Sequence, residues 1–176
     1  MTNKDIREIL NKLGEHERRI NTLERQIKSF KQSNQNNEEK NKSKFPLNFC
    51  ERANIDENQL GHVFYYEEDN LELVCTIEGK SNVEKQFRGA LIILTFYYFW
   101  KGIKKIKSQD LRKMLEEAGI ESLGNLSTNL KKTDYKKYIR PDGISGSPEF
   151  SYKITEPLGI EEGLKIIRDI ALNIGN

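Results

Sequence analysis

The chain has 176 residues, of which 36% are hydrophobic, and this suits one compact domain with an appendage rather than two full domains. Charged residues make up 32% of the chain, but the formal net charge is only +2, so the overall charge does not by itself indicate a nucleic-acid partner. The charge is unevenly distributed: residues 38–79 hold 10 acidic and 4 basic residues, whereas residues 80–140 hold 14 basic and 6 acidic ones. The second segment is therefore the one that would attract phosphate groups.

Several classes of protein are disfavoured by what the chain lacks. Its two cysteines, Cys50 and Cys75, form no CxxC pair and have no histidine cluster beside them, so we expect no zinc site and a reduced, intracellular protein. We expect no secretory signal and no membrane span, because the longest apolar run, residues 90–100, is about half the roughly 20 residues that a span needs. With only two histidines and no nucleotide-binding or hydrolase motif, we expect neither an enzyme nor a cofactor or metal.

Residues 1–30 are predicted to form a coiled-coil helix. Apolar side chains recur there at alternating spacings of three and four over about four heptads, and charged residues occupy the other faces. A parallel or antiparallel homodimer is the simplest way to bury the apolar stripe, and the alternative is a solitary helix that packs on its own globular domain. The predicted dimerisation residues are Ile6, Ile9, Leu13, Ile20, Leu23, Ile27 and Phe30.

A linker and a hairpin are expected to follow. Residues 31–44 contain no apolar side chain and are rich in Asn, Lys and Ser, which is typical of a flexible linker. Residues 45–80 are interpreted as a β-hairpin prelude that packs on the main domain. Its two β-prone runs, residues 62–66 and 71–77, flank an acidic turn at residues 67–70 whose function the sequence does not indicate.

The main domain is predicted to span residues 81–176 and to begin with a helix that runs to about residue 100. Ser81 is the expected N-cap and Gly102 offers a stop, and the apolar residues between them recur at helical spacing. These apolar residues nearly surround the C-terminal end of the helix, so it should be central. The aromatic cluster at residues 96–100 is interpreted as core or dimer contact rather than as a base-stacking surface.

Two short helices joined by a tight turn, the arrangement of a helix-turn-helix, are predicted next. A short extended segment begins at Ile106, Ser108 is the expected N-cap of the first helix, and Gly119 ends that helix. The second helix spans about residues 122–132. Its predicted buried face consists of Leu123, Leu126 and Leu130.

The opposite face of the second helix is the predicted DNA-binding surface. Its amides and hydroxyls can bond to base edges, its lysines can pair with phosphates, and no acidic residue interrupts it. The same polar groups are equally compatible with an exposed helix that binds a protein. The predicted contact residues are Asn125, Ser127, Thr128, Asn129, Lys131 and Lys132.

A second hairpin, the wing, is predicted between residues 138 and 155. Strands at residues 138–140 and 150–155 flank the turn-rich residues 141–148. Small residues at its tip permit a close approach to a sugar-phosphate backbone, although glycines are also ordinary in hairpin loops. The predicted contacts are Gly143, Ser145 and Ser147 at the tip and Lys136, Lys137 and Arg140 at the base. A last amphipathic helix, residues 159–174, is expected to bury Leu164, Ile167, Ile170 and Ala171.

Three segments, residues 78–86, 108–132 and 146–155, resemble small archaeal winged helix-turn-helix proteins, a family of largely undefined role. Together these segments extend the resemblance over roughly residues 78–172, and the coiled coil and linker lie outside it. The resemblance implies the architecture of a DNA-binding regulator, with residues 125–132 in the recognition helix and residues 143–148 at the wing tip.

The sequence thus predicts an α+β fold, a winged helix-turn-helix domain preceded by a β-hairpin and an N-terminal coiled-coil helix. The expected function is binding of double-stranded DNA, sequence-specific or general, by a homodimeric transcriptional regulator or chromatin-associated factor in the cytoplasm, on the nucleoid. The alternative is a winged helix that serves as a protein-protein interaction module in an assembly.

Overall fold

The computed structural model describes residues 19–20, 45–67 and 70–173. The chain divides into two units, residues 1–40 and residues 41–176, and each is considered by itself. Of the first unit only Arg19 and Ile20 are described; both are helical and exposed. The rest of the predicted coiled coil and the whole of the predicted linker lie outside the described residues.

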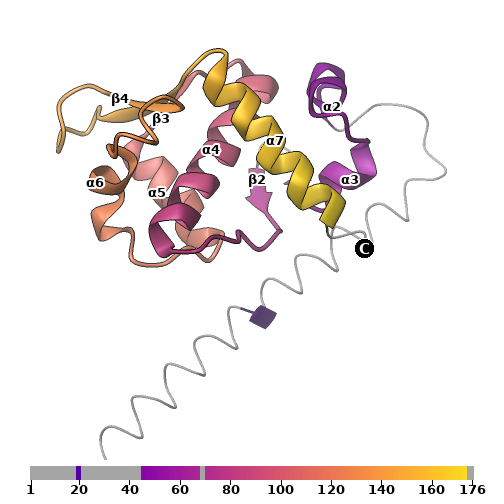
Figure 1. The fold of residues 1–176 in the computed structure, drawn as a ribbon, viewed down its shortest axis with the longest axis horizontal. Coiled ribbons are helices and arrows are strands. Elements are labelled where there is room, and N and C mark those ends of the chain that lie inside the picture. Colours follow the sequence, from indigo (N-terminus) through magenta and orange to yellow (C-terminus); the bar gives the residue numbers. More distant parts are fainter. Residues whose placement is uncertain (1–18, 21–44, 68–69, 174–176) are drawn as a thin grey trace, which may run out of the picture. The chain divides into compact units, whose positions relative to one another are not determined.

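The second unit is of the α+β type, with helices and two small antiparallel sheets (Figure 1). It begins with two short helices that the sequence analysis did not predict, α2 (Leu47–Ala53) and α3 (Glu57–Gly61). A reciprocal capping box starts α3: the backbone N–H of Gln59 donates to Asp56 Oδ1 over 2.8 Å, and the backbone N–H of Asp56 donates to Gln59 Oε1 over 2.9 Å. These two helices pack against the C-terminal helix of the chain.

The first sheet is the predicted hairpin, with shorter strands than expected. Strands β1 (Phe64–Glu67) and β2 (Asn70–Leu73) pair antiparallel, with Phe64 opposite Leu73. The prediction that the second strand continues to residue 77 is wrong. The chain preceding β1 belongs to α3 and its turn, so residues 75–77 have no strand to pair with, although Cys75 and Ile77 are buried.

Helix α4 (Asn82–Lys101) is the central element, as predicted. The Ser81 hydroxyl caps it by accepting a hydrogen bond from the backbone N–H of Glu84 over 3.2 Å, and Gly102 ends it in the left-handed conformation with φ 65°. An unbroken buried run, residues 89–96, crosses the middle of the helix. Phe96 packs against Phe64 and Phe45 in the core, with ring centroids 4.5 and 6.0 Å away, which confirms the interpretation of this aromatic residue as a core residue.

The remaining elements follow in the order strand, two helices, two strands and a helix. They are β3 (Lys105–Lys107), α5 (Ser108–Glu117), a 3₁₀ turn (Leu123–Asn125), α6 (Leu126–Leu130), β4 (Ile139–Asp142), β5 (Ser151–Ile154) and α7 (Leu158–Asn173). The second sheet has the order β3-β5-β4, and both pairings are antiparallel.

The bounds of several of these elements differ from the predicted ones. Ser108 is not the N-cap of α5; it is the first helical residue, Lys107 precedes it, and no side chain caps the helix. Strand β4 begins one residue later than predicted and extends through Pro141 and Asp142, since the backbone of these residues is still in register with β5. Helix α7 buries the four residues expected of it, Leu164, Ile167, Ile170 and Ala171.

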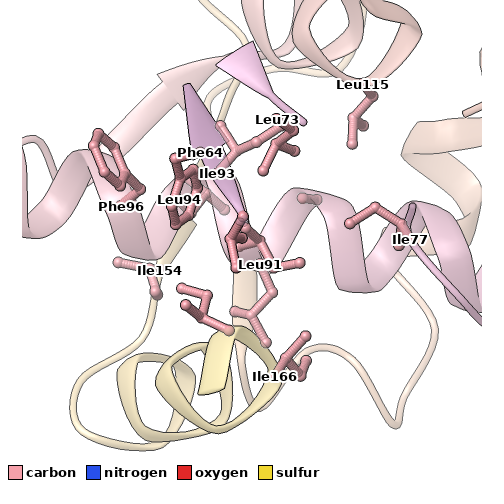
Figure 2. Packing of buried hydrophobic residues seen from close by; sticks show 14 of the residues in the cluster. Phe64, Leu73, Ile77, Leu91, Ile93, Leu94, Phe96, Leu115, Ile154 and Ile166 are labelled. Atoms are coloured by element: carbon pink, nitrogen blue, oxygen red, sulfur yellow. The ribbon is translucent and has the colours of Figure 1, made fainter. Parts of the chain in front are cut away.

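The core lies around α4, against which α5, α6 and α7 pack (Figure 1). Figure 2 shows Leu91 and Leu94 of α4 with Ile166 of α7 and Ile154 of β5 in this cluster. Helix α7 contacts α4 at Gly163, where a Cβ atom would collide with Thr95 Oγ1. Within the described residues no helix is both long and apolar enough to span a membrane.

Candidate nucleic-acid interface

The turn between α5 and α6 uses two left-handed residues. Gly119, with φ 77°, follows α5, and Ser122, with φ 57°, precedes the 3₁₀ turn that leads into α6. The three leucines predicted to anchor the second helix, Leu123, Leu126 and Leu130, are all buried. The helix itself is shorter than predicted, because its first part is the 3₁₀ turn and α6 ends at Leu130, with Lys131 as its C-cap.

A buried amide of α4 holds this turn in place. Gln86 is 1% exposed, and its Nε2 donates to the carbonyl oxygens of Glu121 and Ser122 over 3.2 and 3.1 Å. Its Oε1 accepts a hydrogen bond from Asn129 Nδ2 over 2.8 Å. Both the nitrogen and the oxygen of the Gln86 amide therefore bond to the turn or to α6. Helix α6 is thus oriented relative to α4 by directional hydrogen bonds as well as by apolar packing.

Two further side chains support the same turn. Asn82 Nδ2 donates to the carbonyl oxygen of Glu121 over 2.9 Å, and Arg112 Nη1 donates to that of Leu123 over 2.6 Å. Sequence analysis identified none of Asn82, Gln86 and Arg112. The one available signal concerned Gln86 alone, a polar residue next to the apolar run of a helix.

The predicted contact residues of the second helix fall into two groups. Asn125, Thr128 and Lys132 are exposed and available to a partner, whereas Ser127, Asn129 and Lys131 are half-buried. The amide nitrogen of Asn129 donates to Gln86 and is therefore engaged within the fold. This bond uses one of the two N–H groups of the amide, so Asn129 helps to position α6, and a base contact would have to use its other N–H and Oδ1.

Lys131 connects the helix to the second hairpin. Its Nζ lies 3.4 Å from Ser145 Oγ and 5.2 Å from the centroid of the Phe150 ring. Ser145 belongs to the loop between β4 and β5, so the C-terminal end of α6 and this loop form adjoining parts of one surface. Two of the groups predicted separately, the helix face and the hairpin tip, are thus brought together.

The loop between β4 and β5 has the small, exposed tip that was predicted. Gly143 and Gly146 adopt φ 92° and 91°, which L-residues rarely do, and a backbone bond from Ser147 N to Ile144 O over 3.1 Å closes the turn. Ser145 is exposed and Ser147 is half-buried. Ile144, which the sequence analysis passed over, is 80% exposed.

The cations at the base of the hairpin are exposed: Lys136, Lys137 and Arg140. The segment that carries the two lysines is held by Tyr135, whose ring stacks on Phe87 of α4 at a centroid distance of 4.0 Å. A hydrogen bond to Tyr138, and next the charge interaction with it, raises the pKa of Lys137.

Within the described residues no group of three or more His, Cys, Asp or Glu side chains could hold a metal ion. The predicted dimerisation residues lie outside the described part of the chain, except for Ile20, whose side chain is 54% exposed. Comparison with models of protein families, with curated proteins and with solved structures found no match to this chain.

Proposed function

We propose that this protein binds double-stranded DNA through a winged helix-turn-helix formed by α4, β3, α5, α6 and the β4–β5 hairpin. The observation that carries the proposal is the continuity of α6 with the hairpin loop at the Lys131–Ser145 contact. In this arrangement α6 enters the major groove, and the loop touches the adjacent backbone or minor groove. We further propose that the protein acts as a homodimer through residues 1–30, on the nucleoid in the cytoplasm.

The charge of this surface supports the proposal. Lys132, Lys136, Lys137 and Arg140 are exposed, and no ion pair with a described residue engages any of them. Phosphate contacts by such cations release counterions, so each contact contributes about 0.9 to the slope of log affinity against log salt. The exposed Asn125 and Thr128 supply the groups that can bond to base edges.

The test is a fluorescence anisotropy titration of the full chain with a mixed-sequence duplex at two salt concentrations. We expect binding that weakens steeply with salt, and loss of that binding when Lys131 and Lys132 are both replaced by Glu. A Lys165→Glu variant is the control for a lysine-to-glutamate change elsewhere, because Lys165 is exposed on α7, outside the proposed surface. Absence of binding by the wild-type chain at low salt would end the proposal.

A protein-interaction module is the second candidate function. Exposed apolar side chains favour it, above all Ile144 at the hairpin tip and Leu158, which is 52% exposed at the start of α7. Under this alternative the double glutamate variant leaves assembly with the partner intact, and removal of residues 1–30 is the more damaging change.

A further inference from the structure

The outer face of the second sheet carries a row of three cations. The strand register places Lys105 of β3 opposite Lys153 of β5, and Lys153 opposite Arg140 of β4. Cross-strand partners point to the same side of a sheet, and all three of these side chains are exposed. The other side of the sheet is the core side, where Ile106, Tyr152, Ile139 and Ile154 are buried.

Stability alone does not account for this row. Like charges directly opposite one another destabilise a sheet, and strands about 4.8 Å apart bring three of them within about 10 Å. Among the described residues only Lys105 of the three has an ion-pair partner, Asp142, with Lys105 Nζ 2.9 Å from Asp142 Oδ2. Arg140 and Lys153 make no ion pair within the described part of the chain.

The Lys105–Asp142 pair crosses the sheet from β3 to β4. The hydrogen bond from Lys105 to Asp142 and the positive charge of Lys105, and also the charge of Lys153, lower the pKa of Asp142. At neutral pH this aspartate is therefore an anion inside a cationic face. Lys107 is paired in a similar way with Glu149, over 3.0 Å. The face is thus partly neutralised by its own carboxylates and keeps an excess of positive charge.

The row is close to the interface already described. Arg140 precedes Gly143 by three residues, and since a strand rises about 3.3 Å per residue, the row lies about 10 Å along the hairpin from its tip. A DNA backbone that reaches the tip could continue along the outer face of the sheet.

We propose that Lys105, Lys153 and Arg140 form a phosphate-binding row that extends the DNA contact from the hairpin tip along the outer face of the sheet, and that Asp142 weakens this contact by engaging Lys105. The inference rests on the proposed binding of duplex DNA. Its occupant is the sugar-phosphate backbone, so the row adds affinity without reading sequence.

The experiment compares variants of the full chain that change the charge of this face in opposite directions. Replacing Lys153 by Gln should lower the slope of log affinity against log salt by about 0.9, which corresponds to one lost phosphate contact; Arg140 stays unchanged because the proposed function already uses it. Asp142→Asn should instead tighten binding and raise the slope by up to about 0.9, because it releases Lys105. Lys165→Gln on α7 is the control and should leave both quantities unchanged.

Circular dichroism and thermal melting show whether each variant is folded. Because Asp142→Asn is expected to tighten DNA binding, its effect cannot be mistaken for a loss of binding caused by unfolding. If the wild-type chain binds DNA but Lys153→Gln and Asp142→Asn match it in affinity and slope, the row is not a phosphate site and the proposed function stands. If the wild-type chain does not bind DNA at low salt, both proposals fail together.

Discussion

At the scale of single residues, the side chain of Gln86 decides how the candidate interface is presented. The amide is buried in the face of α4 that meets the turn, and it bonds to two turn carbonyls and to Asn129 of α6. A hydrocarbon side chain of similar size would fill the space but make none of these bonds. Orientation of α6 therefore depends in part on one polar group within a helix that is otherwise largely apolar at its centre.

Gln86→Leu should lower the free energy of unfolding by about 1–3 kcal/mol, since it leaves partly buried polar groups of the turn and of Asn129 without their partner. Urea denaturation followed by circular dichroism measures this change. Asn82→Ala is the matched comparison: it removes one exposed hydrogen bond to the same turn and should cost less. An unchanged urea midpoint for Gln86→Leu would show that water replaces all three bonds at no cost.

The sequence does not reveal which groups Gln86 bonds to. Gln86 and Asn129 are 43 positions apart, and neither periodicity nor local spacing relates them. Patterning did predict the burial of Leu123, Leu126 and Leu130, because apolar side chains at helical spacing need only a core, whatever its shape. The polarity of Asn129 was interpreted only as a DNA contact, and its sequence position gives no sign that its amide also bonds to Gln86 within the fold.

At the scale of elements, length separates what could be predicted from what could not. Helices α4 and α7 are long and periodic and were predicted to within two residues at each end. Helices α2 and α3 have 7 and 5 residues, too few for a periodic signal to develop, and they form because they pack against α7. Strand β2 was predicted too long because its length is set by its partner. Strand β1 begins only at Phe64, after α3, and the β-prone residues 75–77 give no sign of this limit.

The crossing of α4 and α7 gives a prediction at this scale. Gly163→Ala should destabilise the protein by about 1–3 kcal/mol, because the added methyl group meets Thr95 and forces the two helices apart. Gly124→Ala is the control, since a Cβ there has no neighbour within 4 Å. Thermal or urea unfolding measures both variants.

A partner substitution separates this collision from a general effect of alanine. Thr95→Ala removes two of the three atoms that the new methyl group would approach, so the double variant should lose less stability than the two single variants added together. Strict additivity would mean that α7 relieves the contact by moving elsewhere.

At the scale of the whole molecule, the proposed dimer determines how many copies of the DNA-binding unit act together. A dimer through residues 1–30 would present two copies of α6, and two half-sites on one duplex would then be about one helical turn, roughly 34–36 Å, apart or a multiple of that spacing. Tethering also raises the effective concentration of the second unit once the first is bound.

Light scattering of the full chain at micromolar concentration should give twice the mass of the monomer. Ile20→Lys should reduce that mass to the monomer value, because a charged residue in a coiled-coil seam is costly to bury. Arg19→Gln, at the neighbouring position outside the seam, should leave the dimer intact. A monomeric wild-type chain would refute the dimer. DNA binding by single units would then be tested by the anisotropy titration alone.

The central position of α4 has a consequence for how this protein can evolve. Insertion or deletion of one residue between Gln86 and Phe96 would turn one end of the helix by about 100° relative to the other. Either the amide would leave the turn or the aromatic residue would leave the core. Substitutions that keep the side-chain volume can accumulate along this helix, whereas insertions and deletions cannot. Across related proteins the length of this helix should therefore change more slowly than its amino-acid composition.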